Sequence, residues 1–72
     1  MDSLNFGRFR IERDDDPDNE FPYILYDEND DELGAWAAAD AVTLDIDNSP
    51  VGEEITLEQW QTLWDWVESQ GS

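Results

Sequence analysis

The stretch ITLEQWQTLWDWVESQG, residues 55–71, contains the strongest local signal in the chain. Thr56 and Gln59 have the spacing of a capping box, in which the Thr56 hydroxyl accepts a hydrogen bond from the Gln59 backbone N–H and the Gln59 side chain accepts one from the Thr56 N–H. Ile55 and Trp60 occupy the two positions of a hydrophobic staple, which guides the chain into the helix. The stretch therefore predicts that a helix begins directly after the threonine.

Apolar side chains follow this cap at helical spacing. They fall at i, i+3, i+4 and i+7 and form one stripe: Trp60, Leu63, Trp64 and Val67. With Gly71 available to end it, the pattern predicts a helix over residues 57–69 that buries the stripe, with Trp64 at its centre. Trp66 lies about 200° around the helix from Trp64 and only borders the stripe. We therefore expect Trp66 to be partly exposed and available for an apolar contact, including self-association.

The segment before this helix, residues 42–47, alternates apolar and polar residues, which is typical of a strand with one wet face. The alternation defines an inward face of Val42, Leu44 and Ile46 and an outward face of Thr43, Asp45 and Asp47. Residues 48–54 are rich in turn-forming residues and predict a connecting loop.

The first half of the chain also alternates between strand-like and polar segments. Residues 5–13 alternate apolar and charged side chains, which predicts a strand. Carboxylate-rich segments at 14–20 and 27–32 predict exposed loops. The aromatic and β-branched segment between them predicts a strand at 22–27.

Residues 33–39 admit two structures. The alanine run permits a helix, which stays the alternative for residues 35–41. A strand is favoured, because a helix this short is marginal in water and Gly34 would lie inside it. We expect the strand to return antiparallel to the one before it.

These elements predict an α+β fold. We expect a three- or four-stranded antiparallel β-meander with one C-terminal α-helix packed on its apolar face. The chain has 72 residues, which is enough for one core only, so we expect a single domain over residues 1–72. Four Trp, three Phe and two Tyr supply the apolar area that this core needs.

The charge balance excludes several function classes. Asp and Glu number 20 against 3 Lys and Arg, which gives a formal net charge of −17. DNA, RNA and anionic membranes require cationic protein surfaces, so we expect no direct binding to nucleic acid or membrane. The chain contains no Cys and no His, which removes thiolate chemistry, the imidazole base and zinc sites built from these residues.

Neither a metal site nor a catalytic site is predicted. Each acidic loop repeats the first ligand positions of a calcium loop, but neither supplies the glycine at position 6 or the glutamate at position 12. The serines have no His or Lys to activate them, and no apolar wall marks a pair of carboxylates for acid–base chemistry. We expect no metal, no cofactor and no enzymatic activity. No apolar run is long enough for a membrane span and no signal peptide follows Met1, so we expect a cytoplasmic protein.

The three cations are Arg8, Arg10 and Arg13, all within the first predicted strand. We expect them to neutralise neighbouring carboxylates across the sheet. A basic face for a phosphate is the alternative, but such a face would act against the field of 20 acids.

The charge itself needs an explanation, because self-repulsion at −17 destabilises a compact domain and solubility requires far less. One hypothesis is a nucleic-acid mimic, whose carboxylates replace backbone phosphates in the cationic groove of a basic nucleic-acid-binding protein. On the predicted strand, Asp45 and Asp47 would lie roughly 6.6 Å apart, and the two acidic loops would extend that line. The candidate partner-binding residues are Asp14, Asp15, Asp16, Asp18, Glu20, Asp27, Glu28, Asp30, Asp31, Glu32, Asp45 and Asp47.

Two other hypotheses fit the same composition. In a halophilic cytoplasm an acidic surface keeps a protein hydrated, and the function would then be an unrelated protein–protein contact. The third hypothesis is an antitoxin-like or immunity-like inhibitor of a basic nuclease.

In size, charge and acidic sheet-plus-helix plan, the chain resembles the small acidic DNA-mimic counter-defence proteins of phages and mobile elements, including the anti-CRISPR proteins. Asp14-Asp15-Asp16 and the segment 27–32 are the most suggestive parts. The resemblance covers the whole chain and uses no signature motif, so it assigns no role to an individual residue. It implies a stoichiometric inhibitor of a nucleic-acid-binding effector, without catalysis or cofactor, that acts in the host cytoplasm if a phage encodes it.

Overall fold

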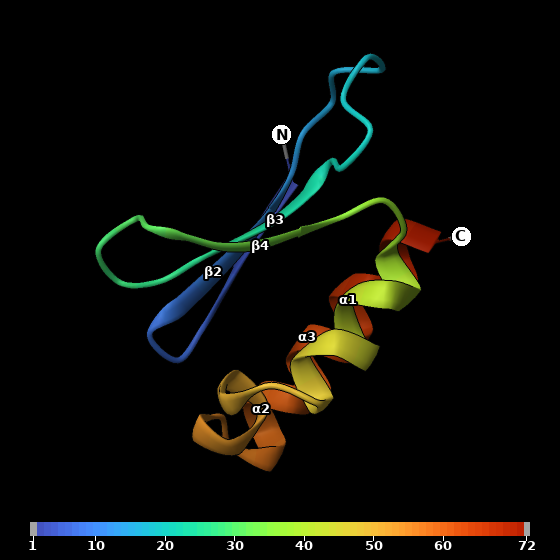
Figure 1. Cartoon of the computed structure of the whole chain (residues 1–72). Helices are drawn as coiled ribbons and strands as arrows, with labels where there is room; N and C mark the ends of the chain where they lie inside the picture. The colour runs from blue at the N-terminus through green and yellow to red at the C-terminus, as the bar shows by residue number, and fades with distance from the viewer. Residues whose placement is uncertain (1, 72) are drawn as a thin grey trace.

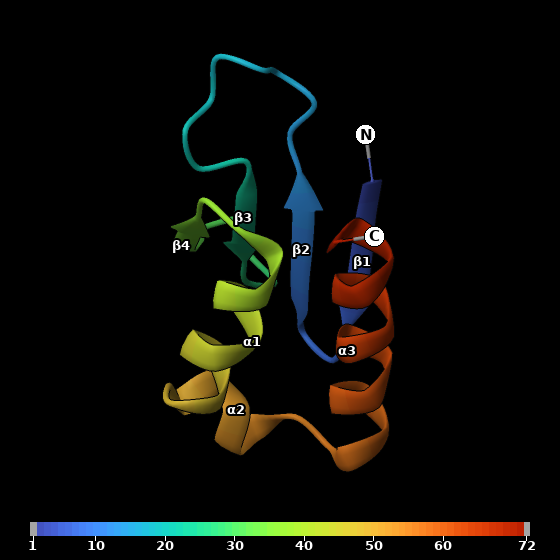
Figure 2. The ribbon, with the colours of Figure 1, turned by 90° about the vertical axis from the view of Figure 1, so that its right-hand side faces the viewer.

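A computed structural model describes residues 2–71. Its elements in chain order are β1 (Asp2–Phe6), β2 (Phe9–Arg13), β3 (Tyr23–Tyr26), β4 (Glu32–Trp36), α1 (Ala39–Asp47), α2 (Pro50–Glu54) and α3 (Leu57–Gly71). The strands form one antiparallel sheet in the order β1-β2-β3-β4. Helices α1 and α3 lie side by side over one face of it (Figure 1, Figure 2). The α+β class, the antiparallel meander and the C-terminal helix on its apolar face are confirmed.

The core lies between this face of the sheet and the two long helices. Phe6 pairs with Phe9, and Ile11 pairs with Leu25, so side chains from three strands gather under the helices. The buried core residues are Phe6, Phe9, Ile11, Tyr23, Leu25, Ala39, Val42, Ile46, Leu63 and Val67. Removing such apolar area from water, at about 25 cal/mol per Å², is the main force that stabilises the fold.

The single strand predicted over residues 5–13 is wrong, because this segment belongs to a hairpin of two strands. Gly7 and Arg8 form the turn between β1 and β2. Gly7 has a φ of +62°, which residues with a side chain rarely adopt. The hairpin lets Phe6 and Phe9 stack at its end, with ring centroids 5.8 Å apart.

The segment 22–27 contains β3, as predicted. The strand predicted over residues 33–39 is confirmed only up to Trp36, where β4 ends. The pairing of these strands shifts by one residue beside Leu25. The shift leaves Leu33 as an extra residue on β4, which is the arrangement of a β-bulge.

The strand predicted over residues 42–47 is also wrong, because these residues form helix α1 together with the alanine-rich segment before them. Alanine has the highest helix propensity, and Asp40 in the first turn suits the positive end of the helix dipole. Asn48 ends the helix, since its backbone N–H and its side-chain amide both donate to the Leu44 carbonyl, at 3.3 and 2.9 Å. Residues 35–36 therefore belong to β4 and residues 39–41 to α1, with Ala37 and Ala38 between the two elements.

The change from strand to helix moves side chains between core and solvent. Ala39, Val42 and Ile46 are buried at helical spacing. Leu44, predicted to point inward, is 63% exposed, whereas Thr43, predicted to point outward, is buried. Helix α1 therefore presents a large apolar side chain to solvent.

The predicted loop over residues 48–54 contains the short helix α2. Pro50 is its first residue, where a missing N–H leaves no hydrogen bond unmade. Gly52 packs against the end of α1, and a Cβ added to it would lie 2.5 Å from the Ile46 carbonyl oxygen. The close approach of α2 to α1 therefore requires glycine at this position.

We expect Gly52→Ala to lower the free energy of unfolding by about 1–3 kcal/mol, because the added methyl group forces the two helices apart. Glu53→Ala, at an exposed position of the same helix, is the matched control and should change it by less than about 0.5 kcal/mol. Urea unfolding followed by circular dichroism measures both variants. Equal stabilities would contradict the tight contact between α1 and α2.

Helix α3 confirms the capping box. The Thr56 N–H donates to Gln59 Oε1 at 2.8 Å, and the Gln59 N–H donates to Thr56 Oγ1 at 3.1 Å. Ile55 and Trp60, the predicted staple residues, are both partly buried against the core. The helix continues to Gly71, two residues beyond the predicted end.

Helix α3 is rotated about its axis relative to the predicted stripe. Leu63 and Val67 are buried as expected, but Trp64 is 39% exposed. Trp66 packs against the core instead and meets Tyr23 edge-to-face, with ring centroids 6.3 Å apart. The physical reason is that α3 has neighbours on two sides, the sheet and α1, so its buried arc is centred on Leu63 and reaches round to Trp66.

We expect Trp66→Ala to destabilise the protein by about 3 kcal/mol and Trp64→Ala by only about 1 kcal/mol, because Trp66 fills the contact with the sheet. Thermal unfolding of both variants, measured side by side in moderate salt, tests this order. The reverse order would place Trp64 in the core and contradict the orientation of α3.

Candidate binding surface

The two acidic loops lie at opposite ends of the sheet (Figure 1). In an antiparallel meander, the β1–β2 hairpin and the β3–β4 turn share one end, and the β2–β3 loop lies at the other. A strand of five residues spans roughly 16 Å. The acidic segments 14–20 and 27–32 are therefore separated by about the length of a strand.

Most of the predicted partner-binding carboxylates are exposed. Asp14 and Asp27 are half-buried, and each begins its loop. The exposed ones are Asp15, Asp16, Asp18 and Glu20 in the β2–β3 loop, Glu28, Asp30, Asp31 and Glu32 at the β3–β4 turn, and Asp45 and Asp47 on α1.

Asp14 organises the β2–β3 loop. Its carboxylate accepts hydrogen bonds from the Asn19 side-chain amide at 3.0 Å and from the Asp16 N–H at 3.1 Å. These donors, the Asn19 amide first, hold the pKa of the Asp14 carboxyl below its usual value. The Asp14 N–H donates to the Pro22 carbonyl at 2.8 Å. The loop therefore presents its other carboxylates from a hydrogen-bonded turn.

Asp27 has the same role in the β3–β4 turn. Its Oδ1 accepts hydrogen bonds from the N–H groups of Asn29 at 2.8 Å and Asp31 at 3.0 Å. Asp30 has a φ of +64°, a region that aspartate tolerates better than most residues. Both acidic segments are thus ordered by the first aspartate of the turn.

Two arginines lie beside the β3–β4 turn. Arg10 is 2.7 Å from the Asp30 carboxylate and 3.3 Å from that of Glu12. Arg8 is 2.7 Å from Glu54 and 4.0 Å from Glu28. The hydrogen bonds to Glu54 and Asp30 raise the pKa of the Arg8 and Arg10 guanidinium groups, respectively. The predicted neutralising role is confirmed for these two arginines.

The third arginine differs. Arg13, at the end of β2, donates to Gln70 Oε1 of α3 at 3.1 Å. The prediction that all three arginines share one strand is wrong, because Arg8 lies in the hairpin turn between β1 and β2.

The row of carboxylates predicted for Asp45 and Asp47 is also wrong, because both residues lie on α1. Residues two apart on a helix point about 200° apart, so they do not share one outward face. Asp45 accepts a hydrogen bond from the Trp36 indole N–H. Asp47 lies on the side of α1 that faces Trp60 of α3.

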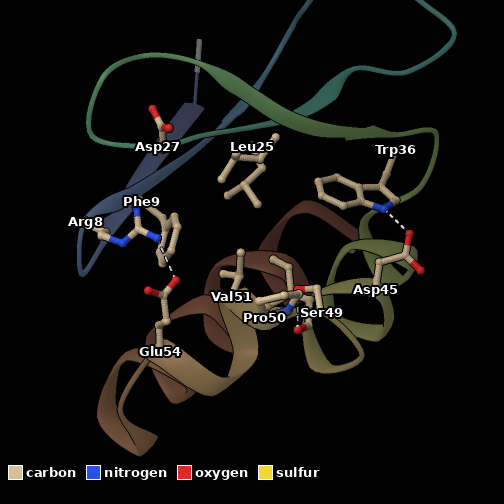
Figure 3. Close-up of a pocket in the computed structure, with 12 residues that line it drawn as sticks. Arg8, Phe9, Leu25, Asp27, Trp36, Asp45, Ser49, Pro50, Val51 and Glu54 are labelled. Atoms are coloured by element: carbon tan, nitrogen blue, oxygen red, sulfur yellow. Dashed lines mark hydrogen bonds and ion pairs between the residues drawn. The ribbon is translucent and has the colours of Figure 1, made fainter.

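A groove of about 410 Å³ lies between the β3–β4 half of the sheet and the layer of α1 and α2 (Figure 3). Its apolar lining consists of Phe9, Leu25, Leu33, Trp36, Ile46, Pro50 and Val51. The Arg8–Glu54 and Trp36–Asp45 contacts connect the sheet to the helical layer at its two ends. The groove thus suits an apolar group. The two contacts at its ends were not predicted from the sequence, because each joins segments that are distant along the chain.

Trp66 was predicted to be partly exposed and available for an apolar contact. Trp66 is half-buried. The large apolar side chains that are exposed are Phe21, Leu33, Leu44, Leu57 and Trp64. Leu57 lies outside the apolar stripe predicted for α3. Its position relative to that stripe is the feature of the sequence that indicates an exposed side chain.

Within residues 2–71, no group of three carboxylates lies close enough together to hold a metal ion. None of the helices in this part of the chain is both long enough and apolar enough to cross a membrane. No protein-family model, curated protein or solved structure matches the chain.

The pKa of the Asp14 carboxyl is expected to lie below the reference value of about 3.9 and to rise in Asn19→Ala, which removes its main donor. Because the folded-state pKa is depressed, the contribution of Asp14 to stability is present above the unfolded-state pKa and is lost as the pH falls through the folded-state value. Carboxyl carbon chemical shifts followed against pH measure this pKa. Asn29→Ala, in the other acidic turn, is the control, and an Asp14 pKa unmoved by Asn19→Ala would contradict the assignment.

Proposed function

We propose that the protein is a non-catalytic, stoichiometric inhibitor that mimics nucleic acid and occupies the basic nucleic-acid-binding surface of a partner protein, such as a CRISPR or other defence effector. The observation that carries this proposal is the segregation of charge. The three cations lie within the first 13 residues, and positions 14–72 contain no Lys or Arg. A cationic groove would therefore meet carboxylates on the β2–β3 loop, the β3–β4 turn and the helices.

The dimensions of the molecule support the proposal. Its longest extent is 33 Å, comparable to about ten base pairs of duplex at 3.4 Å each. The two acidic loops are roughly 16 Å apart, a distance that a duplex covers along its axis in about five base pairs. The mimic would thus present two acidic ends connected by a sheet, in place of the single row that the sequence predicts.

The β2–β3 loop is the stronger contact of the two. It holds five carboxylates between residues 14 and 20, whereas Arg8 and Arg10 already pair with Glu28 and Asp30 at the other end. A carboxylate that already has a guanidinium partner gains less from a second cation.

Adaptation to a halophilic cytoplasm is the second candidate function, and the complete absence of lysine beside 20 acids favours it. In that case the acidity serves solubility, and nucleic acid would not compete with this protein for the partner. An antitoxin-like or immunity-like inhibitor would differ from the leading proposal only in the identity of its partner, a basic nuclease.

Affinity for the partner is expected to fall by on the order of tenfold or more between 50 and 200 mM NaCl, because screening weakens contacts between carboxylates and a cationic groove. Excess duplex or single-stranded nucleic acid is expected to displace the protein. The partner is captured from a lysate of the source organism or its host, purified, and titrated by calorimetry. Affinity that is insensitive to both salt and competitor would exclude mimicry and leave the halophilic alternative.

Loop variants locate the contact. Asp15, Asp16 and Asp18 replaced together by Asn should weaken partner binding. We expect the fold to be retained, because asparagine keeps the side-chain oxygen with which Asp16 accepts the Asp18 N–H, and circular dichroism checks this. The matched control replaces Glu28, Asp30 and Asp31 by their amides, which removes the same formal charge at the other end of the sheet. A larger loss of affinity in the control would assign the main contact to the β3–β4 turn.

A further inference from the structure

A second surface of the protein lies along the line where α1 and α3 run side by side (Figure 2). We call it the α1–α3 seam. Its apolar residues are Leu44, Leu57, Trp60 and Trp64, and its acidic residues are Asp40, Asp47 and Glu68. Leu44, Leu57 and Trp64 are 63%, 81% and 39% exposed. Large apolar side chains exposed on two neighbouring helices indicate a contact surface.

Two hollows open along the seam. One, of about 580 Å³, reaches down to Tyr23 of the sheet and to the alanines at the start of α1. Its other lining residues are Trp64, Val67 and Glu68 of α3 and Asp40 of α1. The other, of about 260 Å³, is lined by Leu57 and Trp60 of α3 and by Asp47 of α1. Each hollow therefore combines an indole from one helix with a carboxylate from the other.

The spacing of these groups follows from helix geometry. Asp40, Leu44 and Asp47 stand at i, i+4 and i+7, so they share one side of α1. Trp60 and Trp64 stand one turn apart on α3, and their rings meet edge-to-face with centroids 6.3 Å apart. The seam thus presents a shallow apolar track between two rows of side chains, with a carboxylate beside each hollow.

The charge of the seam decides what can occupy it. Residues 39–71 contain no Lys or Arg, so the charged side chains on both helices are all carboxylates. A second copy of the chain, also at −17, would place like charges opposite one another, which opposes self-association through this face. The occupant must bring both apolar side chains and cations.

We propose that the α1–α3 seam binds a cationic amphipathic helix of the partner protein. Its apolar face would enter the track between α1 and α3, and its Lys or Arg side chains would reach Asp40, Asp47 and Glu68. Helices commonly dock into such grooves through apolar residues at i, i+3, i+4 and i+7. The inference rests on the proposed function only in taking the partner to be a basic protein, and it adds an apolar contact that phosphate mimicry does not require.

The test uses two synthetic peptides of 18 residues, built from the same Lys and Leu residues. In one peptide the leucines follow the amphipathic helical pattern, and in the other they are scrambled. Both carry the same charge, so general attraction to the acidic surface is equal for both. We expect the amphipathic peptide to bind roughly tenfold more tightly in calorimetry, the difference typical of a well-placed apolar contact, and to gain helical circular dichroism on binding.

Neutral variants separate the seam from the overall charge. Leu44→Gln combined with Leu57→Gln leaves the net charge unchanged and should remove roughly that tenfold preference. The matched control is Phe21→Gln combined with Leu33→Gln, which replaces two exposed apolar residues outside the seam and should keep it. In nitrogen–proton spectra, the indole N–H signals of Trp60 and Trp64 should shift on binding.

Three outcomes would overturn the inference: equal affinity for the two peptides, an equal loss in the control variant, or indole shifts confined to Trp36 at the groove of Figure 3. The two proposals fail separately. If the amphipathic peptide binds as expected but nucleic acid does not displace the protein from its partner, the proposal for the seam stands and mimicry fails. If the loop variants weaken partner binding but the peptides do not discriminate, mimicry stands and the seam fails.

Discussion

Burial of one apolar sheet face beneath α1 and α3 has to outweigh the mutual repulsion of 20 carboxylates. The first and last elements of the chain share this contact, since Phe6 of β1 and Phe9 of β2 belong to the same buried cluster as Leu63 and Val67 of α3. Short helices are marginal on their own in water. The helices therefore depend on the sheet, and every exposed acidic group depends on this one apolar interface for its position.

The limited positive charge is placed where it orders the acidic segments. Arg8 and Arg10 lie at the same end of the sheet as the β3–β4 turn and contact Glu28, Asp30 and Glu54 from different elements. The β2–β3 loop is ordered differently, by hydrogen bonds within the loop that end on Asp14. The two acidic ends therefore differ in how they are ordered: ion pairs with arginines order one end, and hydrogen bonds within the loop order the other.

Features with local chemistry were predictable from the sequence, and features decided by packing were not. The Thr56–Gln59 box was predictable because its donors and acceptors lie within four residues. Segment 42–47 was not, because its apolar residues satisfy a period of two while Ala39, Val42 and Ile46 also satisfy the helical period. Only contact with α3 and the sheet selects the helix.

The same division applies to the candidate site. Composition alone predicted that the carboxylates are exposed, because a core of this size has no room for them. Neither the groove of Figure 3 nor the α1–α3 seam was predictable, because each brings together residues from separate elements. The orientation of α3 was not predictable either, since Trp66 packs against Tyr23 of β3, which is far from it in the sequence.

The contacts of the N-terminal hairpin have a consequence for folding kinetics. Arg8 reaches Glu54 and Arg13 reaches Gln70, across 46 and 57 residues of chain. Contacts of such sequence separation form only after a large loop has closed, and they slow folding relative to local ones. During synthesis, the segments that form the sheet therefore lack their helical cover until α3 has left the ribosome.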